Sequence, residues 1–527
     1  MKIKVALLID NLKIKKWQKL SLEEAKEKID IVLILNCKNT FNKKHIFKNF
    51  FYYLVNFFSL KNHYTKQHQL VGFNGKIINF KSNYTGTWQS IPKNVIKKLK
   101  SQNVNLIIKF GMNLLKIDKH TSGLSILSFH HGNPSKYRGR PAGFYEILND
   151  EKNVGTIVQN ITNKLDAGKI YAFSESKIIN YSYKKTAINF YNNSRFLLSK
   201  AIDNFLKKKK IKINKDGANY KLPINYKVLK FLFLIFFNFI KKIFYGLFFE
   251  KKWKIAISNN KLQLKGDEIL LSKYFKEIPI TKKYSRYADP FFSHDYKNMR
   301  LEAINKSGNL GDLIEIPINN SKKQKLLMSG NHYSYPFSFM YKKIEYLLPE
   351  VSSHSAPYFI EMDGNYKKKF FLKGLNNQRI VDATLFKHKD FWCIFFGKKF
   401  DAINVLHLWI SDNPFKEFKP HPKTPIVISP KSARMGGNIL SLKNRIFRFG
   451  QNNEREYGES LSVIEIKKLT PKDFLEKYIG TIKIDKYKGP HTINFNSKSK
   501  KIIFDFYINK FSLFAGIRRI KTLLKRP

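Results

Sequence analysis

The chain has few cysteines, few acidic residues and no secretion-signal pattern. Only Cys37 and Cys393 occur in 527 residues, too few for a disulfide framework, which favours a reducing compartment. The apolar segment 5–9 is too short for the core of a signal peptide, and no small-residue cleavage site follows it. We therefore expect a cytoplasmic protein that begins with a β-strand.

The scarcity of acidic residues produces a large positive charge. There are 39 acidic and 97 basic residues, which give a formal net charge of +58. The lysines are scattered, and no basic stripe with readout side chains is visible, so we expect no specific nucleic-acid binding. The scatter fits a genome-wide compositional bias. Attraction to an anionic membrane surface or to a phosphorylated substrate remains open.

The length and texture of the chain predict two domains and a linker. A chain of 527 residues exceeds one ordinary core. Residues 1–205 alternate strand-like and helix-like segments, which predicts an α/β, Rossmann-like domain with a parallel sheet. We expect strands at 5–9, 31–35, 104–108 and 124–127, and helices at 22–28 and 91–102. Ligands of such sheets bind beyond the carboxyl ends of the strands.

Residues 206–250 form a basic and aromatic linker. Segment 228–249 is long and apolar but contains Lys230, Lys241 and Lys242, and a lysine near the bilayer centre costs about 2.5–3.5 kcal/mol. We therefore favour an interfacial helix with snorkelling lysines, peripheral at the inner face of the membrane, over a spanning helix. A buried helix between the domains is the alternative.

Residues 251–527 have a different texture. Short aromatic strands such as 391–396 and 404–409 recur between turn residues, although no strict repeat is visible. This spacing predicts an all-β sandwich, barrel or propeller.

A block in the first domain carries candidate chemistry. Ser128-Phe-His130 is followed by Tyr137-Arg-Gly and then by Leu-Asp166-Ala-Gly168. Each piece alone is typical of an ordinary turn. Together, a histidine after a strand and a distant carboxylate predict a catalytic dyad of His130 and Asp166. The block resembles the folate-dependent formyltransferases, whose pattern runs Asn-x-His, Pro-x-Tyr-Arg-Gly and Leu-Asp-x-Gly, over residues 1–205.

The resemblance implies a site and a formyl donor, and no metal. His130 would be the acid, base and oxyanion donor, Asp166 would orient it, and Ser128 would assist. The donor would be 10-formyltetrahydrofolate, bound against the backbone of Phe110, Gly111 and Met112. The loop residues that would contact the acceptor are Asn133, Tyr137, Arg138 and Gly139.

The sequence departs from this pattern at one position. Ser128 stands where the family has asparagine, and a hydroxyl is shorter than an amide and offers fewer hydrogen bonds. Loss of one oxyanion donor costs about 10²–10³ in rate. His131 and Asn133 are the candidates for compensation.

The second domain carries a second resemblance. Ala288-Asp289-Pro-Phe resembles the first-blade signature of five-bladed propellers that hydrolyse or transfer sugars. Further motifs resemble the propeller-type N-terminal domain of glucosamine inositolphosphorylceramide transferases: His332–Pro336, Leu348–Glu350, Val381–Phe386, His421-Pro422, Ser432–Arg434, Gln451, Tyr457-Gly458 and Gly489–Thr492. The resemblance implies a five-bladed propeller-like domain over 251–510.

Four residues are candidates for the mouth of this propeller. They are Asp289, Glu350, Asp382 and Arg434. Glycoside chemistry needs two carboxyl groups about 5–9.5 Å apart. The alternative is a purely structural role, in which these residues stabilise turns and strands. No clear general acid is visible in the later blades, so we favour sugar binding without catalysis, with Arg434 and His332 contributing.

Three functions follow. The leading hypothesis is formyl transfer from 10-formyltetrahydrofolate to the amine of a nucleotide- or lipid-linked amino sugar in surface glycan synthesis. The second, motivated by Ser128, is a propeller-based glycosyltransferase, glycosidase or glycan-binding protein with a degenerate first domain. The third is formylation of methionyl-tRNA, which is disfavoured because no small β-barrel follows residue 205.

Overall fold

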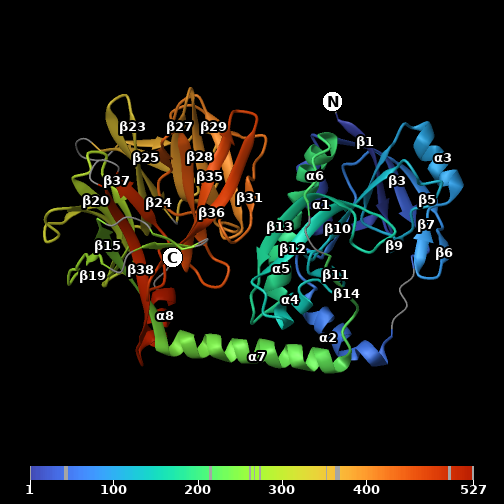
Figure 1. Ribbon diagram of the computed structural model, residues 1–527, viewed down its shortest axis with the longest axis horizontal. Helices are drawn as coiled ribbons and strands as arrows, with labels where there is room; N and C mark the ends of the chain where they lie inside the picture. Colours follow the sequence, from blue (N-terminus) through green and yellow to red (C-terminus); the bar gives the residue numbers. More distant parts are fainter. Residues whose placement is uncertain are drawn as a thin grey trace. The chain divides into compact units, whose positions relative to one another are not determined.

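The computed structural model describes residues 2–40, 45–212, 216–259, 263–265, 268–271, 274–351, 353–362, 368–496 and 500–524. These residues form two compact units, 1–240 and 241–527 (Figure 1). The division falls inside helix α7 (Asn225–Phe248). Cys37 and Cys393 are both buried and free.

Unit 1 is built on a seven-stranded mixed sheet. Its order is β13-β12-β10-β8-β1-β3-β5. The bounds are β1 Ile3–Ile9, β3 Ile29–Cys37, β5 Lys76–Phe80, β8 Leu106–Lys109, β10 Ser125–His130, β12 Asn153–Asn160 and β13 Lys169–Lys177. The first five strands along the chain are parallel, which confirms the strands expected at 5–9, 31–35, 104–108 and 124–127. The sheet is not purely parallel, because β12 and β13 form an antiparallel hairpin at its edge.

Helices pack around this sheet. Their bounds are α1 Lys16–Ala25, η1 Phe47–Asn49, α2 Phe50–Ser59, α3 Lys93–Ser101, α4 Phe144–Leu148, α5 Tyr183–Ser194 and α6 Leu197–Leu206. α3 buries Val95, Ile96 and Leu99 against the parallel strands, and α5 and α6 pack on β12 and β13. The helix expected at 91–102 is confirmed as α3, whereas the one expected at 22–28 begins earlier, at Lys16, where the side chain of Gln18 accepts from the Lys15 amide. Small sheets join β2 (Lys13–Lys15) to β4 (Gln67–Gln69), and β6 (Asn83–Thr85) to β7 (Trp88–Ser90) and β9 (Leu114–Leu115).

The predicted linker contributes to unit 1. β14 (Ala218–Tyr220) pairs in parallel with β11 (Tyr137–Gly139). Val228 and Phe231, in the first turns of α7, are fully buried with Phe144 and Tyr183. The compact unit therefore extends to residue 240 instead of ending at 205, because backbone pairing and aromatic packing both tie this segment to it.

The described residues of unit 2 form five sheets, all antiparallel except for one parallel strand pair at the edge of the fourth. The bounds of the first three are β19 Tyr284–Phe292, β20 Asn298–Asn305, β21 Gly311–Pro317 and β22 Lys325–Met328; β23 Tyr333–Tyr341, β24 Ile344–Val351, β25 Tyr358–Glu361 and β26 Lys369–Phe371; and β27 Ile380–His388, β28 Phe391–Lys398, β29 Val405–Ser411, β30 Lys419–Pro420 and β31 Val427–Ile428. The fourth contains β32 Arg434–Met435, β33 Leu440–Leu442, β34 Arg445–Asn452, β35 Ser460–Leu469 and β36 Phe474–Ile484, with β16 Gln263–Lys265 and β17 Glu268–Leu271 at its edge. The fifth is β37 Ile493–Asn496, β38 Lys501–Phe511, β15 Phe249–Ser258 and β18 Lys276–Glu277. A final helix, α8, spans Ala515–Leu524.

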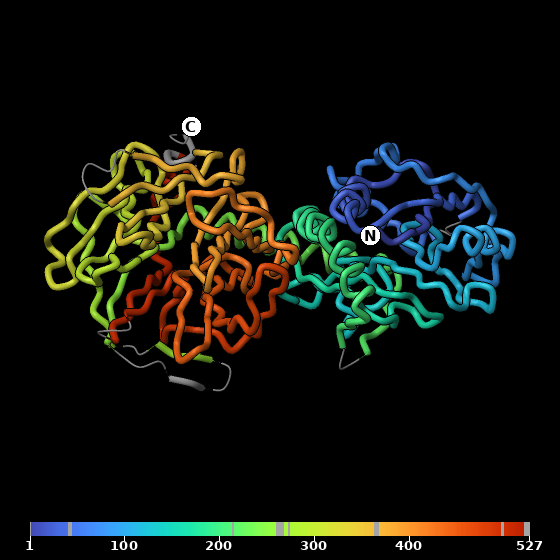
Figure 2. Tube along the Cα trace, turned by 90° about the horizontal axis from the view of Figure 1, so that it is seen from above, coloured from blue at the N-terminus to red at the C-terminus, as the bar shows by residue number. Residues whose placement is uncertain are grey.

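The five sheets pack in a cycle. One core cluster joins the first sheet to the second, another joins the second, third and fourth, and a third joins the fourth to the fifth. Ile255 and Ile503 of the fifth sheet pack on Tyr287 and Met299 of the first. The fifth sheet combines both ends of the unit, because β15 pairs with β38. In Figure 2 the colours of this unit accordingly follow one another around it, and none of the described sheets closes on itself.

Candidate functional site

The predicted dyad of unit 1 is assembled. His130 is the last residue of β10, and its Nδ1 lies 3.2 Å from Oδ2 of Asp166, in the loop between β12 and β13. Its Nε2 lies 3.0 Å from the carbonyl oxygen of Tyr137. Both ring nitrogens therefore face oxygen atoms. Both side chains are largely buried, at 8% and 14% exposure.

The Tyr137–Gly139 strand holds both members of the dyad through its backbone. The Tyr137 carbonyl contacts His130, and the Gly139 amide donates to Oδ2 of Asp166 at 2.8 Å. Gln159 donates from Nε2 to the other Asp166 oxygen at 3.1 Å. Gly139 has φ +85° and lies against the Tyr220 carbonyl, so a side chain at 139 would collide with β14. The loop thus positions the dyad.

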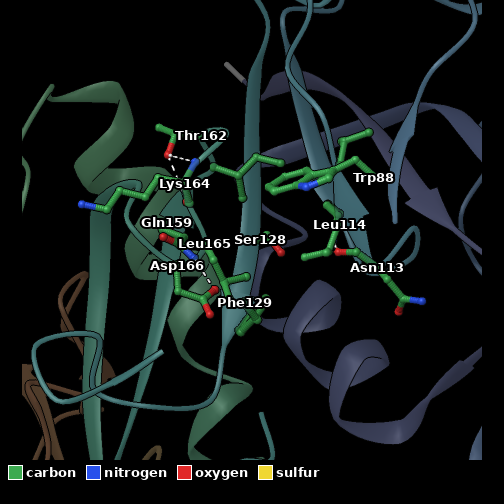
Figure 3. Close-up of a pocket in the computed structure, with 13 residues that line it drawn as sticks. Trp88, Asn113, Leu114, Ser128, Phe129, Gln159, Thr162, Lys164, Leu165 and Asp166 are labelled. Carbon is green, nitrogen blue, oxygen red and sulfur yellow. Dashed lines mark hydrogen bonds between the residues drawn. The ribbon is translucent and has the colours of Figure 1, made fainter. Parts of the chain in front are cut away.

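A cavity of about 110 Å³ lies beside the dyad (Figure 3). Its walls come from Trp88, Lys109, Asn113, Leu114, Leu115, Ser128, Phe129, Gln159, Ile161, Thr162, Lys164, Leu165 and Asp166. Asp166 therefore faces the cavity, and His130 stands behind it, between Asp166 and Tyr137. Ser128, Gln159 and Asp166 supply polar surface, while Trp88 and the leucines supply apolar surface.

Three polar side chains form a row across neighbouring strands of this wall. Ser128 of β10 is in register with Lys109 of β8 and with Gln159 of β12. Lys109 donates to the Asn113 carbonyl at 3.2 Å. Burial lowers its pKa to about 8, although the carboxylates of Asp10 and Asp166 oppose that shift. Sequence patterns did not reveal Lys109 or Gln159, because strand register decides which residues flank Ser128.

The predicted folate contacts lie beside the cavity wall but are not part of it. The amides of Phe110 and Gly111 donate to the Leu8 carbonyl, and the Met112 amide donates to Asp10 at 2.7 Å. Gly111 is required there, since a Cβ would lie 2.6 Å from the Asp10 amide nitrogen. Contact between this segment and a pterin stays a prediction.

The predicted acceptor loop is engaged within the protein. Asn133 accepts from Ser135 in a local turn. Arg138 is buried and donates to Asp216 at 2.5 Å. The hydroxyl of Tyr137 donates to Glu151, and burial raises its pKa. None of these side chains lines the cavity, so substrate contact by Asn133, Tyr137, Arg138 and Gly139 stays a prediction.

His131 is a packing residue. Its ring lies between Trp17, Phe190 and Tyr191, and its Nε2 lies 2.9 Å from the hydroxyl of Ser194. Burial lowers its pKa to about 3, so it is neutral at physiological pH. Its ring is engaged by these aromatic side chains and by Ser194 and does not line the cavity, so it does not supply the missing donor.

Unit 2 contains a second polar cavity, of about 210 Å³. Its lining includes three of the four predicted propeller residues. The full lining is Trp253, Arg286, Ala288, Asp289, Glu302, Ile304, His332, Ser334, Glu350, Arg434, Tyr457 and His491. Asp382, the fourth, contacts it through an ion pair with Arg434. The predicted residues are therefore brought together by strands of different sheets.

Irregular backbone aims these groups inward. The innermost strands of three successive sheets each have a bulge, at Asp289, Tyr335 and Asp382, with φ of 50°, 46° and 48°. Such values are uncommon for residues other than glycine, and bulges redirect side chains. Each bulge amide donates to a carboxylate: Asp289 to Asp505, Tyr335 to Asp289 and Asp382 to Glu350.

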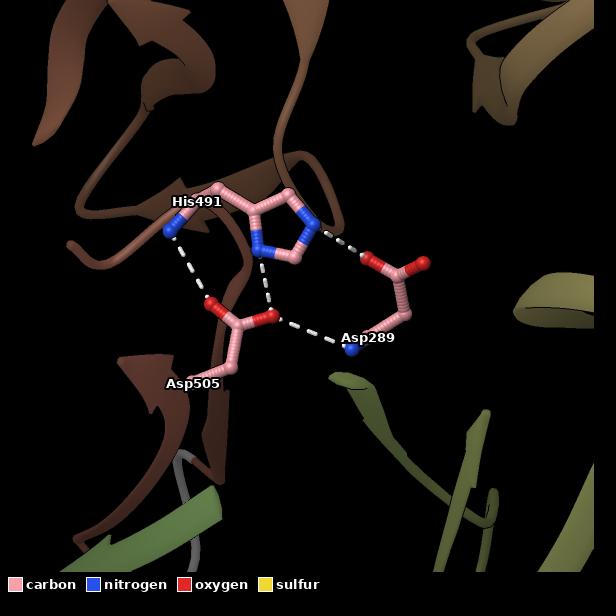
Figure 4. Close-up of side chains that lie close together, drawn as sticks. All are labelled: Asp289, His491 and Asp505. Atoms are coloured by element: carbon pink, nitrogen blue, oxygen red, sulfur yellow. Dashed lines mark hydrogen bonds and ion pairs between the residues drawn. The ribbon is translucent and has the colours of Figure 1, made fainter. Parts of the chain in front are cut away.

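Asp289, His491 and Asp505 form a buried ion-pair cluster (Figure 4). His491 Nδ1 lies 2.6 Å from Asp505, and its Nε2 lies 3.3 Å from Asp289. These carboxylates outweigh burial and raise the pKa of His491 to about 9, while burial raises that of Asp289 to about 6. The three side chains could enclose a cation, but both imidazole nitrogens already face carboxylates, so a charged histidine occupies that role.

Two glutamates complete the wall of this cavity. Burial raises the pKa of Glu302 to about 8 and that of Glu350 well above its usual range. Glu302 lies 3.5 Å from His332. Glu302 and Asp505 were missed by sequence reasoning, whereas the motif that contains His491 was noted without a role. Glu302 lies on a second strand, outside every motif, and only the packing of the sheets places it at the cavity.

We predict that the charge of His491 stabilises unit 2. His491→Gln leaves Asp289 and Asp505 without their cation and should cost about 3 kcal/mol, as loss of one member of a buried pair does. Because the pKa rises from 6.5 to about 9 on folding, this stabilisation is complete below pH 6.5 and is lost as the pH rises through 9. Thermal unfolding of the full chain should show a difference between variant and wild type that shrinks over this interval. The exposed His354→Gln is the control, and a pH-independent difference would contradict the charged state.

Comparisons with known proteins match the two units separately. Residues 320–501 match the family described as glucosamine inositolphosphorylceramide transferase 1, N-terminal. The proteins of that name from Arabidopsis thaliana and Oryza sativa subsp. japonica are 30% and 29% identical over 154 and 165 residues. Each match covers 28% of this chain, and the chain spans about a fifth (20%) of each relative's length.

Solved structures resemble part of the chain at low identity. Phosphoribosylglycinamide formyltransferase from Anaplasma phagocytophilum is 12% identical, with a TM-score of 0.29, and covers 42% of this chain and 98% of its own. A 4-N formyltransferase from Francisella tularensis is 13% identical, with a TM-score of 0.30, and covers 44% of this chain and 87% of its own.

Proposed function

We propose that the protein transfers a formyl group from 10-formyltetrahydrofolate to the amine of a nucleotide- or lipid-linked amino sugar, in surface glycan synthesis. The observation that supports this most is the contact between His130 and Asp166 at the end of a parallel strand, beside a cavity lined by Lys109, Ser128 and Gln159. The ordered motifs of the formyltransferase pattern fall on these same residues. The name of the family matched by unit 2 contains glucosamine, an amino sugar, which favours this class of acceptor.

The reaction exchanges one C–N bond for another. A bond forms between the acceptor nitrogen and the formyl carbon, the bond from that carbon to the folate nitrogen breaks, and one proton passes from the first nitrogen to the second. Asp166 faces the cavity and is placed to take the proton from the amine. His130 stabilises this carboxylate from behind and holds its orientation. Their buried contact makes them act as one unit.

Lys109 is proposed to supply the donor that Ser128 lacks. The formyl oxygen gains negative charge as the amine adds, and donors aimed at it lower the barrier. Lys109 and Ser128 are in register and line the same wall, so an ammonium and a hydroxyl can both reach one oxygen. With a pKa of about 8, Lys109 is mostly charged at neutral pH and releases a proton more readily than an exposed lysine.

We further propose that the five sheets of unit 2 are the blades of a five-bladed propeller, and that the central cavity binds a sugar. The support is the cyclic packing of the sheets and the position of Asp289, Ser334 and Arg434 on their innermost strands. Carboxylates and an arginine over aromatic rings suit hydroxyl and amino groups of a saccharide. This unit would present the glycan acceptor.

The formyl-transfer proposal predicts folate-dependent formylation of an amino sugar. The purified full chain should convert nucleotide-linked amino sugars only when 10-formyltetrahydrofolate is added, as measured by mass spectrometry. His130→Ala and Asp166→Asn should each lower kcat at least about 10²-fold, since acid–base groups contribute about 10²–10⁴. The control His120→Ala lies outside the cavity. If no amine is formylated, or both variants match the wild type, the proposal fails.

The role of Lys109 predicts a particular pH profile. Lys109→Met should lower kcat about 10²-fold with little change in KM, because the donor acts on charge that develops in the transition state. In the wild type the rate should fall as the pH rises through 8, where the ammonium deprotonates, and this limb should be absent from the variant. Adding Ser128→Asn to Lys109→Met should restore part of the rate. An unchanged limb in the variant would assign it to another group.

A second candidate function is glycoside chemistry in unit 2. It is favoured by the contrast between Glu302, with a pKa of about 8, and Asp289, with a pKa of about 6, because a protonated and an ionised carboxyl group can act as acid and base. Under this hypothesis Glu302→Gln and Asp289→Asn should abolish release of sugar from aryl hexosaminides but spare formylation. Wild-type protein that binds hexosamines without cleaving them would leave unit 2 a binding module.

A further inference from the structure

Unit 1 exposes an unusual amount of aromatic surface on two helices. We call it the aromatic face; it comprises the outward side chains of η1 and α2 and those of α7 up to Ile240. Phe47 and Phe58 are 94% and 66% exposed, and Phe233 and Phe236 are 69% and 61% exposed. Soluble proteins rarely leave a contiguous apolar patch of this kind, and such patches mark interaction sites.

The two helices form one surface. Asn49 donates to the Pro223 carbonyl at 2.8 Å, just before α7, and Asn225 donates to the Phe47 carbonyl at 2.8 Å. The Asn225 side chain also accepts from the Phe51 amide. These bonds fix η1 and α2 beside the first turn of α7, where Figure 1 shows them side by side. The aromatic face is therefore a fixed feature of unit 1.

The packing of α7 favours a helix that lies flat over one that spans a membrane. By length and composition alone, α7 could cross a bilayer. However, Val228 and Phe231 are fully buried in unit 1, where the Phe231 ring stacks on Phe144 at 4.2 Å. Asn238, farther along, donates to the Asn180 carbonyl. A helix with one side seated on a folded domain offers lipid only its other side.

The charge around the aromatic face is of one sign. Segments 45–62 and 217–249 contain no aspartate or glutamate. Lys48, Lys61 and Lys227 are exposed there, and the Lys61 ammonium lies 3.6 Å from the centre of the Phe57 ring. Lysines beside exposed aromatics are complementary to anionic headgroups above an apolar layer.

We propose that the aromatic face binds an anionic lipid surface, with α7 parallel to the membrane plane and its phenylalanines inserted below the headgroups. The observations that carry this are the exposed rings, the single sign of charge and the side of α7 that is already occupied by unit 1. The proposal does not depend on the formyl-transfer proposal, although a membrane-bound enzyme would suit a lipid-linked acceptor.

Vesicle cosedimentation with the full chain tests the proposal. The protein should sediment with vesicles of phosphatidylcholine mixed with phosphatidylglycerol, bind less to phosphatidylcholine alone, and dissociate partly at high salt. The double variants Phe233→Asp with Phe237→Asp, and Phe57→Asp with Phe58→Asp, should each bind at least about tenfold more weakly, since each removes two exposed rings that would insert into the lipid. The control is Phe400→Asp, which changes a ring in unit 2 that is 92% exposed.

A charge variant provides an independent readout. Lys48→Gln with Lys227→Gln should weaken binding to the anionic vesicles and leave binding to neutral ones unchanged. The proposal is overturned if wild-type protein stays in the supernatant with both kinds of vesicle, or if the double phenylalanine variants sediment as the wild type does. It is also overturned if light scattering shows a lipid-free dimer that only those phenylalanine variants dissociate, which would assign the face to a second copy of the chain.

Discussion

The site of unit 1 depends on a three-residue strand whose backbone holds two side chains from distant parts of the sequence. The Tyr137 carbonyl contacts His130, and the Gly139 amide contacts Asp166. This strand is fixed in turn by its pairing with β14 and by the bond from Arg138 to Asp216. Segment 216–220 looks like the start of a linker in the sequence, yet it anchors the strand that aligns the dyad. A substitution in segment 216–220 would therefore disturb the alignment of His130 and Asp166 without contacting either side chain.

The contact between His130 and Asp166 was predictable from sequence, but the backbone groups that hold the two side chains were not. His130 follows an apolar strand and Asp166 lies in a recognisable turn, so the motifs located both. The predicted roles, His130 as acid, base and oxyanion donor with Asp166 orienting it and the Tyr-Arg-Gly loop contacting the acceptor, stay predictions. In the structure Asp166 lines the cavity, and the backbone of the loop contacts both members of the dyad. The sequence did not indicate Lys109 as a site residue, because its position beside Ser128 depends on the register between strands β8 and β10.

Three sheets of unit 2 share the same backbone feature, a bulge with a positive φ, although their sequences do not form a strict repeat. Bulges recur at Asp289, Tyr335 and Asp382, with positive φ each time. Pro-Phe follows the first two of these residues, whereas Ala-Thr follows Asp382. That is why the strand texture and the motif series predicted an all-β unit while no strict repeat could be seen. The backbone amide freed by each bulge is satisfied by a carboxylate, so buried acidic groups are needed for the fold itself. Two of these carboxylates, Asp289 and Glu350, also line the cavity and make it polar.

The acidic residues follow the same pattern in both units. The chain contains 97 basic and 39 acidic residues. An exposed lysine needs no fixed partner, so a lysine-rich surface costs little folding stability. Buried carboxylates such as Asp166, Asp289 and Asp505 could not be replaced by lysine, because each accepts hydrogen bonds from backbone amides and lies against a histidine. Carboxylates therefore lie where the interior needs an acceptor, while segments 45–62 and 217–249 of the aromatic face contain none. The excess of basic residues says little as a total, but the positions of the acidic residues are informative. Carboxylates line both cavities, and the aromatic face, which lacks them, suits an anionic lipid layer.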